Sequence, residues 1–135
     1  MTKEIRHKVT IHATPAEVYA ALMDEKKHAR FTGAPASIGR RVGTAFACYG
    51  NYVTGITVEL VPAKRIVQVW RSKGWPKGTY SLVTFKFTKL AGGKTRLDFS
   101  HIGVPANDYA SKNRGWRFHY WQPLKRYLEE TANAH

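Results

Sequence analysis

The fold is decided by residues 115–130, whose sequence is GWRFHYWQPLKRYLEE. Four apolar residues recur there at helical spacing on one face, namely Trp116, Tyr120, Leu124 and Tyr127. Four more are expected to widen that face, namely Phe118, Trp121, Lys125 and Leu128. Pro123 lies inside this helix, where it removes a backbone hydrogen bond and tends to kink the axis. So broad an apolar stripe needs a large concave cover, which the rest of the chain must supply.

Length and composition indicate one globular domain over residues 1–135. Hydrophobic residues make up 43% of the chain, which is rich in aromatic side chains. The formal net charge is +13, from 22 Lys and Arg against nine Asp and Glu. A field of this sign attracts acidic partners, but the cations are scattered rather than grouped in a block. The scatter favours a basic surface that serves solubility, with an acidic protein partner as the alternative, and it disfavours nucleic acid.

Sequence features also bear on the cellular compartment. No apolar run approaches the roughly 20 residues of a transmembrane segment, and the charged first residues do not resemble a signal peptide. Cys48 is the only cysteine, which excludes an internal disulfide. Together these features predict a cytoplasmic protein. They leave a monomer and a homodimer equally open.

Local patterns predict a strand, two short helices, a run of strands and then the long helix. Residues 5–11 alternate as a strand does. Thr14, Pro15 and Glu17 form a capping box with proline at the first helical position, and Asp24 begins a second short helix. Further strands are expected at residues 36–38, 44–49, 52–61, 65–71, 80–90 and 95–102.

These elements indicate an α+β fold, because meandering strands with segregated helices form two layers. The sheet would be antiparallel and curved, with about seven strands around the C-terminal helix. Gly55 lies inside one strand and marks a bulge or a close-packing point. Residues 106–112 are expected to form a connector with one helical turn.

The order of elements is that of the helix-grip fold, and several short motifs sharpen the match. The sequence resembles the family named after activators of the heat-shock protein 90 ATPase, within the START and birch-pollen-allergen-like (SRPBCC) superfamily. The motifs that carry this resemblance are IHATP at 11–15, FTGA at 31–34, GTAF at 43–46, ELVP at 59–62, VWR at 69–71, WP at 75–76, GTYS at 78–81, GVP at 103–105, GW at 115–116, YW at 120–121 and PLK at 123–125.

The resemblance implies a sheet wrapped around the C-terminal helix, with a pocket between them. Members of the superfamily often bind lipids, hormones or other hydrophobic molecules in that pocket, and some are enzymes. The family name comes from a eukaryotic co-chaperone that has an additional N-terminal domain. The resemblance thus implies either a ligand-binding protein or a chaperone-associated module.

Strand parity supplies one set of candidate pocket residues. Ser81, Val83 and Phe85 share one face of their strand, and the apolar members mark that face as inward. The same parity points Phe99 and His101 inward. Pockets of this kind are mostly apolar with a few polar groups, so Ser81 and His101 are the polar candidates.

A second set of candidates comes from the helix and the strands opposite it. Trp116 and Tyr120 would form a lid, and Tyr49, Tyr52 and Trp70 would line the wall. We expect residues 115–120 to sit near the pocket and residues 124–128 to be plain core.

Two residues could carry chemistry, and each has a structural alternative. His101 could bind a ligand's polar head or act as an acid or base, or it could be a buried histidine paired with Ser81. Arg71 could hold a ligand carboxylate, or it could pair with an aromatic ring such as Tyr80.

No other catalytic or cofactor site is indicated. The six histidines lack the spacing of metal ligands, Cys48 has no activating partner, and no nucleotide-binding motif occurs, so we predict no metal and no cofactor. The leading hypothesis is a protein that binds a small hydrophobic or amphipathic molecule. The alternatives are a chaperone-associated interaction module and an enzyme that acts on an aromatic or polyketide-like substrate. Whether the chain is an enzyme is left open.

Overall fold

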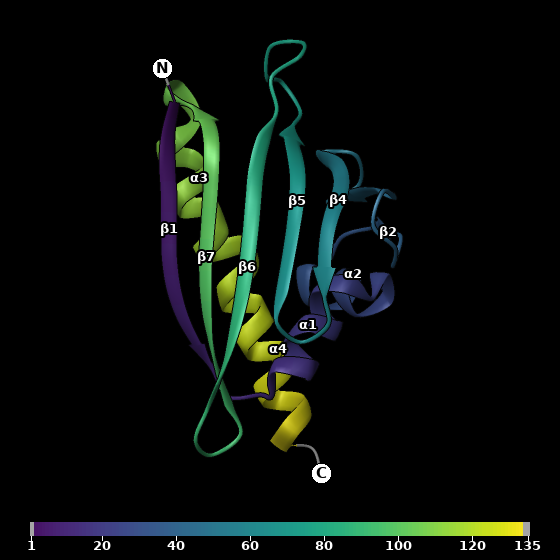
Figure 1. The fold of residues 1–135 in the computed structure, drawn as a ribbon, viewed down its shortest axis with the longest axis vertical. Coiled ribbons are helices and arrows are strands. Elements are labelled where there is room, and N and C mark those ends of the chain that lie inside the picture. Colours follow the sequence, from purple (N-terminus) through teal and green to yellow (C-terminus); the bar gives the residue numbers. More distant parts are fainter. Residues whose placement is uncertain (1, 134–135) are drawn as a thin grey trace.

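The computed structural model describes residues 2–133, with side chains described for residues 3–130. Seven antiparallel strands form one sheet in the order β1-β7-β6-β5-β4-β3-β2 (Figure 1). Adjacent strands are consecutive in sequence except that β1 pairs with β7. The strands are β1 (Thr2–Ile11), β2 (Ala36–Ile38), β3 (Ala45–Cys48), β4 (Val53–Val61), β5 (Arg65–Ser72), β6 (Ser81–Leu90) and β7 (Lys94–Pro105).

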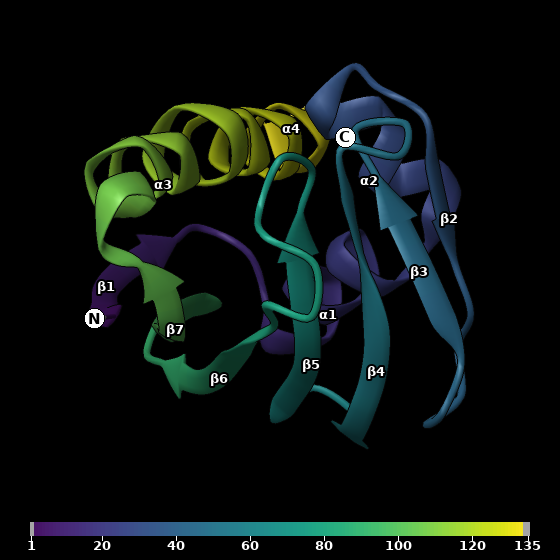
Figure 2. The same ribbon diagram turned by 90° about the horizontal axis from the view of Figure 1, so that it is seen from above.

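The helices lie on the concave side of this sheet. Figure 2 shows the sheet curving around one continuous helical rod made of α3, η2 and α4, with α2 near β2 and α1 packed against α2. The predicted helix-grip architecture of the α+β class is thereby confirmed. The helical segments are α1 (Pro15–Met23), α2 (Glu25–Thr32), η1 (Ala106–Asp108), α3 (Tyr109–Trp116), η2 (Arg117–Trp121) and α4 (Gln122–Asn133).

Both short helices begin where the caps were predicted. The hydroxyl of Thr14 accepts from the backbone N–H of Glu17, whose carboxylate accepts from the backbone N–H of Thr14. Asp24 caps α2 by accepting from the N–H groups of Lys26 and Lys27. Gly33 ends α2 at a φ of 73°, a left-handed conformation that glycine adopts without a steric penalty. These caps set the ends of α1 and α2, the two helices that connect β1 at one edge of the sheet to β2 at the other edge.

Strand parity correctly gave the buried face of β6 and β7. Ser81, Val83 and Phe85 are all buried, as are Phe99 and His101. The aromatic rings of this face meet those of the C-terminal helix, with the centroid of Phe99 4.3 Å from that of Trp116. The core is therefore an aromatic layer between the sheet and the helix.

Gly55 is a close-packing point rather than a bulge. A Cβ at this position would lie 1.9 Å from the carbonyl oxygen of Val69 and 2.7 Å from the ring of Phe46. The bulge of β4 falls three residues later, where the register shifts between Thr57 and Glu59.

The C-terminal helix begins earlier than expected. Residues 106–112 were predicted as a connector, but α3 starts at Tyr109 and continues through Gly115. A second correction concerns Phe118, which was expected beside the buried face and is 57% exposed. Phe118 follows Trp116 by two residues, which is about half a helical turn. Its side chain therefore points away from the core.

A π-helical turn interrupts this helix just before Pro123. In η2 the N–H of Gln122 bonds to the carbonyl of Arg117, one residue further back than in an α-helix. The wider turn brings residues five apart onto the same face, and the rings of Trp116 and Trp121 stack with centroids 5.6 Å apart. Pro123 has no N–H to continue the ladder. The predicted disturbance at Pro123 thus takes the form of a π turn.

The convex face of the sheet carries an exposed apolar row. Its members are directly opposite one another on adjacent strands and have the opposite parity to the buried residues. The row consists of Ile56 on β4, Val69 on β5, Leu82 on β6 and Ile102 on β7. We call this set the outer row. Three of its members are exposed, and Val69 is half-buried.

The packing at Gly55 predicts a large difference between two glycine substitutions. Gly55→Ala should lower the free energy of unfolding by about 1–3 kcal/mol, because its Cβ meets a backbone carbonyl that cannot move aside. Gly115→Ala is the matched control: its Cβ would lie 3.7 Å from His119, and alanine should favour the helix by up to about 1 kcal/mol. Urea denaturation measures both, and equal effects would contradict the assignment.

Candidate functional site

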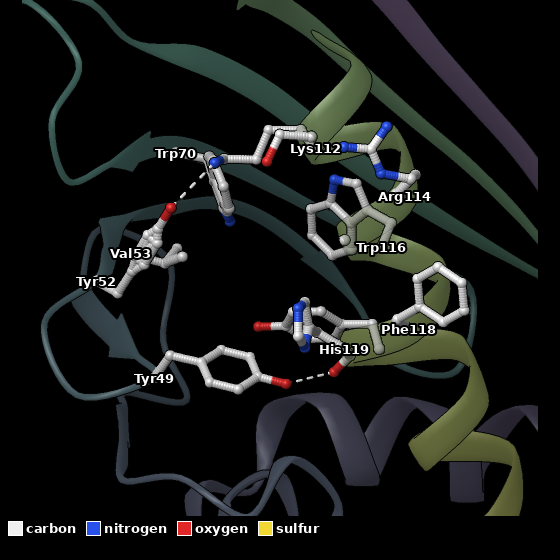
Figure 3. A pocket seen from close by; sticks show the side chains of 12 residues that line it. Tyr49, Tyr52, Val53, Trp70, Lys112, Arg114, Trp116, Phe118 and His119 are labelled. Atoms are coloured by element: carbon white, nitrogen blue, oxygen red, sulfur yellow. Dashed lines mark hydrogen bonds between the residues drawn. The ribbon is translucent and has the colours of Figure 1, made fainter. Parts of the chain in front are cut away.

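A pocket of about 460 Å³ opens between the β3–β4 turn and the first half of the C-terminal helix (Figure 3). Five of the residues predicted to line a pocket do line it: Tyr49, Tyr52, Trp70, Trp116 and Tyr120. The pocket also includes Val53 and six helix residues, namely Ser111, Lys112, Arg114, Gly115, Phe118 and His119. Its wall is mainly aromatic, with polar groups at a few positions.

Tyr49 closes one side of the pocket. It has a φ of 52°, a left-handed conformation uncommon for a residue with a side chain. Its ring packs edge-on against Tyr120, and its hydroxyl donates to the backbone carbonyl of His119 (Figure 3). Burial raises the pKa of Tyr49 to about 12, so the phenol remains a donor at neutral pH. This bond joins the turn after β3 to the helix.

Lys112 occupies the opposite side, near Tyr52. Its ammonium lies 2.8 Å from the carboxylate of Asp108 and 5.3 Å above the ring of Tyr52. It is also 3.4 Å from the Tyr52 hydroxyl, the second contact marked in Figure 3. Asp108 accepts a further hydrogen bond from the indole N–H of Trp75 at 2.7 Å. Asp108 thus links a lysine of the pocket wall to the indole of Trp75, which does not line the pocket.

His101 lies beneath the pocket rather than in its wall. The indole N–H of Trp116 donates to His101 Nδ1 at 3.0 Å, so Nε2 carries the proton and donates to Ser81 Oγ at 2.7 Å. Ser81 in turn donates to the carbonyl of Trp70 at 2.8 Å. Burial lowers the pKa of His101 to about 3. Both nitrogens of the imidazole are thus hydrogen-bonded within the protein. This arrangement matches the structural alternative for His101, a buried histidine paired with Ser81.

Arg71 holds the loop between β5 and β6. Its guanidinium donates to the backbone carbonyls of Trp75, Pro76 and Thr79 at 2.7–3.0 Å. It also lies 5.9 Å from the centroid of the Tyr80 ring. These donors face the loop, and Arg71 does not line the pocket. The enzyme hypothesis depended on His101 and Arg71, and both are held by internal contacts.

The remaining predicted residues form the layer under the pocket floor. Ser81, Val83, Phe85 and Phe99 are buried and do not line the pocket. Phe85 and Phe99 instead pack against the ring of Trp116 from the sheet side. The structure thus separates the predicted set into a pocket wall and a supporting layer.

Helical spacing could have found the residues that the sequence analysis missed. Lys112 lies one α-helical turn before Trp116, and Ser111 one turn before Gly115, so both lie on faces already assigned to the pocket. They were assigned to a connector because the helix was expected to begin at Gly115. Val53 and Arg114 gave no such signal.

A second, smaller cavity of about 20 Å³ lies deeper between helix and sheet, with room for about one water molecule. His28 and Cys48 meet there, with Nε2 3.7 Å from Sγ. Burial lowers the pKa of His28 to about 4 and raises that of Cys48 to about 12. The pair is therefore a neutral imidazole beside a neutral thiol, not an activated nucleophile.

No three His, Cys, Asp or Glu side chains among the residues that the structure describes lie together as metal ligands would. None of the helices in the described part of the chain is long and apolar enough to cross a membrane.

Comparison with known sequences identifies a family. The model of the family "Activator of Hsp90 ATPase homolog 1-like protein" matches residues 12–129. The human protein "Activator of 90 kDa heat shock protein ATPase homolog 1" is 32% identical over 124 residues, covering 92% of this chain and 36% of the human protein. A Dictyostelium discoideum homologue is 28% identical, covering 86% of this chain and 30% of that protein. The chain thus spans about a third of the length of these relatives.

Solved structures show the same fold. An HSP90 activator from Plasmodium falciparum superposes with a TM-score of 0.80 at 21% identity, covering 88% of this chain and 90% of that one. The Aha1 dimer from Colwellia psychrerythraea gives a TM-score of 0.78 at 20% identity, with 94% and 96% covered. At such identities the likeness extends to the fold alone.

Buried histidines predict a loss of stability in mild acid. Below pH 6.5 the unfolded chain protonates His28 and His101, whereas the folded chain resists protonation until about pH 4 and about pH 3. The free energy of unfolding should therefore fall by about 1.4 kcal/mol per pH unit for each of the two as the pH drops from 6.5 towards those values.

Urea denaturation at pH 4.5 to 7.5 measures this slope. Replacing the exposed His12 with Gln should leave the slope unchanged. NMR titration gives an independent readout: an imidazole of His101 that gains its proton near pH 6.5 in the folded protein would contradict the buried hydrogen-bond chain.

Proposed function

The chain belongs to the Activator of Hsp90 ATPase homolog 1-like family, and we propose that it binds a small hydrophobic or amphipathic molecule in the pocket beside its C-terminal helix. The observation that carries this proposal is the pocket itself. Its volume of about 460 Å³ falls in the range of about 300–1,000 Å³ that is usual for small-molecule sites.

The composition of the wall supports the same proposal. Aromatic rings from the β3–β4 turn, from β5 and from the helix converge there, and a few polar groups are interspersed. A surface of this kind favours the burial of a flat apolar body. The floor is held by the hydrogen bonds below it, so the cavity exists before any ligand arrives and needs little reorganisation.

We further propose that residues 1–135 act as one domain and that the protein is cytoplasmic. The buried, unpaired thiol of Cys48 is in keeping with a reducing compartment. A monomer and a homodimer both fit these features, and one structural neighbour is described as a dimer.

Gly115 offers a direct test of pocket binding. A leucine at this position would project into the pocket, because only His119 lies within 4 Å of an added Cβ. The neutral fluorophore N-phenylnaphthylamine should bind the native protein, and Gly115→Leu should weaken that binding about tenfold or more. Gly115→Ala is the matched control and should bind nearly as well as the native protein.

Fluorescence titration measures these affinities, and native mass spectrometry of freshly purified protein tests for a molecule that copurifies. If the native protein binds neither this fluorophore nor a panel of hydrophobic ligands, the proposal fails.

A second candidate function is an interaction with a 90 kDa heat shock protein, as the names of the relatives suggest. Two features of this chain favour it. The outer row offers an apolar strip across four strands, and the net charge of +13 would attract an acidic protein to the molecule. In this second proposal the occupant of the outer row is an acidic surface of that chaperone.

The second candidate predicts a rise in the ATPase rate of a purified 90 kDa heat shock protein when this chain is added. The double substitution Leu82→Glu with Ile102→Glu should abolish the rise, because it places two carboxylates in the contact. Thr88→Glu, at the far end of β6, is the matched control. Salt at about 0.5 M should weaken the interaction because the screening length falls to a few ångströms. An unchanged ATPase rate with the native chain would refute this candidate.

A further inference from the structure

The polar groups of the pocket are not spread evenly over its wall. Lys112, Arg114 and the hydroxyl of Tyr52 belong to one rim, as Figure 3 shows. Trp70, Trp116 and Tyr120 form a floor that is almost fully buried. The pocket is thus amphipathic, with a cationic rim above an aromatic floor.

The charge at this rim is positive and lacks a matching carboxylate within the pocket. Among the residues whose side chains the structure describes, no Asp or Glu lines the cavity. The carboxylate of Asp108, which contacts Lys112 of the rim, also accepts from the indole of Trp75. The net charge of +13 adds to the same positive potential. Lys112 shares its charge with Asp108, so Arg114 is the cation of this rim that most favours an entering anion.

Arg114 is the cation of this rim whose hydrogen-bond donors remain available to a ligand. Among the described residues, no hydrogen bond or ion pair engages its guanidinium, whereas Lys112 is held by Asp108 and Tyr52. A guanidinium presents a planar fork of donors that matches two oxygens of a carboxylate or sulfonate. Lys112 has a third N–H that can add to such a contact.

We propose that the molecule bound in this pocket is a monoanionic amphiphile, whose carboxylate or sulfonate is held by Arg114 and Lys112 while its flat aromatic or acyl body lies on Trp70, Trp116 and Tyr120. This inference rests on the proposed ligand-binding function and specifies its chemistry. A neutral lipid would leave the guanidinium of Arg114 unpaired, and a cationic ligand would be repelled by it.

A pair of fluorophores tests the anionic requirement. Anilinonaphthalene sulfonate and N-phenylnaphthylamine share one aromatic skeleton and differ by the sulfonate. The native protein should bind the sulfonate about tenfold more tightly, a difference of about 1.4 kcal/mol. Arg114→Gln should remove most of this preference by weakening the binding of the sulfonate much more than that of the neutral fluorophore.

Arg126→Gln is the matched charge control. Arg126 is exposed on α4 and does not line the pocket, so its loss removes one charge from the protein without changing the rim. This variant should retain the preference for the sulfonate. The indole N–H signals of Trp70 and Trp116 should shift in NMR spectra on binding, which places the fluorophore in the folded protein's pocket.

The outcomes separate the two proposals. Equal affinities for the two fluorophores would overturn the anionic selectivity and leave ligand binding intact. A similar loss in Arg126→Gln and Arg114→Gln would assign the preference to overall charge and would also overturn the inference. Binding of neither fluorophore would remove the proposed function together with this inference.

Discussion

The hydrogen-bond chain from Trp116 through His101 and Ser81 to the carbonyl of Trp70 is the constraint on which the pocket depends. An indole N–H can only donate, so each later group in the chain has a fixed donor and acceptor role. The chain connects the helix to β7, β6 and β5. Because every polar atom in it is paired, the two tryptophans that form the pocket floor are held in place, and the floor resists collapse into the core.

A second constraint originates at Pro123. Its missing N–H ends the α-helical ladder, and the preceding turn widens into a π-helix. In an α-helix the carbonyl of His119 would accept from residue 123, and here it accepts from the hydroxyl of Tyr49 instead. The proline therefore does more than bend the axis. It frees a backbone acceptor through which the turn after β3 is attached to the helix, and this attachment forms one wall of the pocket.

The sequence was most informative where local chemistry decides the structure. The caps at Thr14 and Asp24 and the alternation in β6 depend on near neighbours, and they were predicted correctly. The pocket was harder to predict because its wall combines segments that are distant in sequence. The true start of the helix at Tyr109 was missed, because residues 106–112 were predicted to be a connector with no more than one helical turn. Without those additional turns of helix, the cationic rim could not be predicted.

The two candidate functions use opposite faces of the same sheet, and three consecutive residues of β5 show how they are kept apart. Trp70 points into the pocket floor, whereas Val69 belongs to the outer row and Arg71 is tied to the following loop. Since successive side chains of a strand point to opposite faces, a substitution in the outer row leaves the pocket wall in place. Conversely, a side chain added at Gly115 fills the pocket without reaching the convex face. Substitutions on the two faces can therefore test the two proposed functions separately.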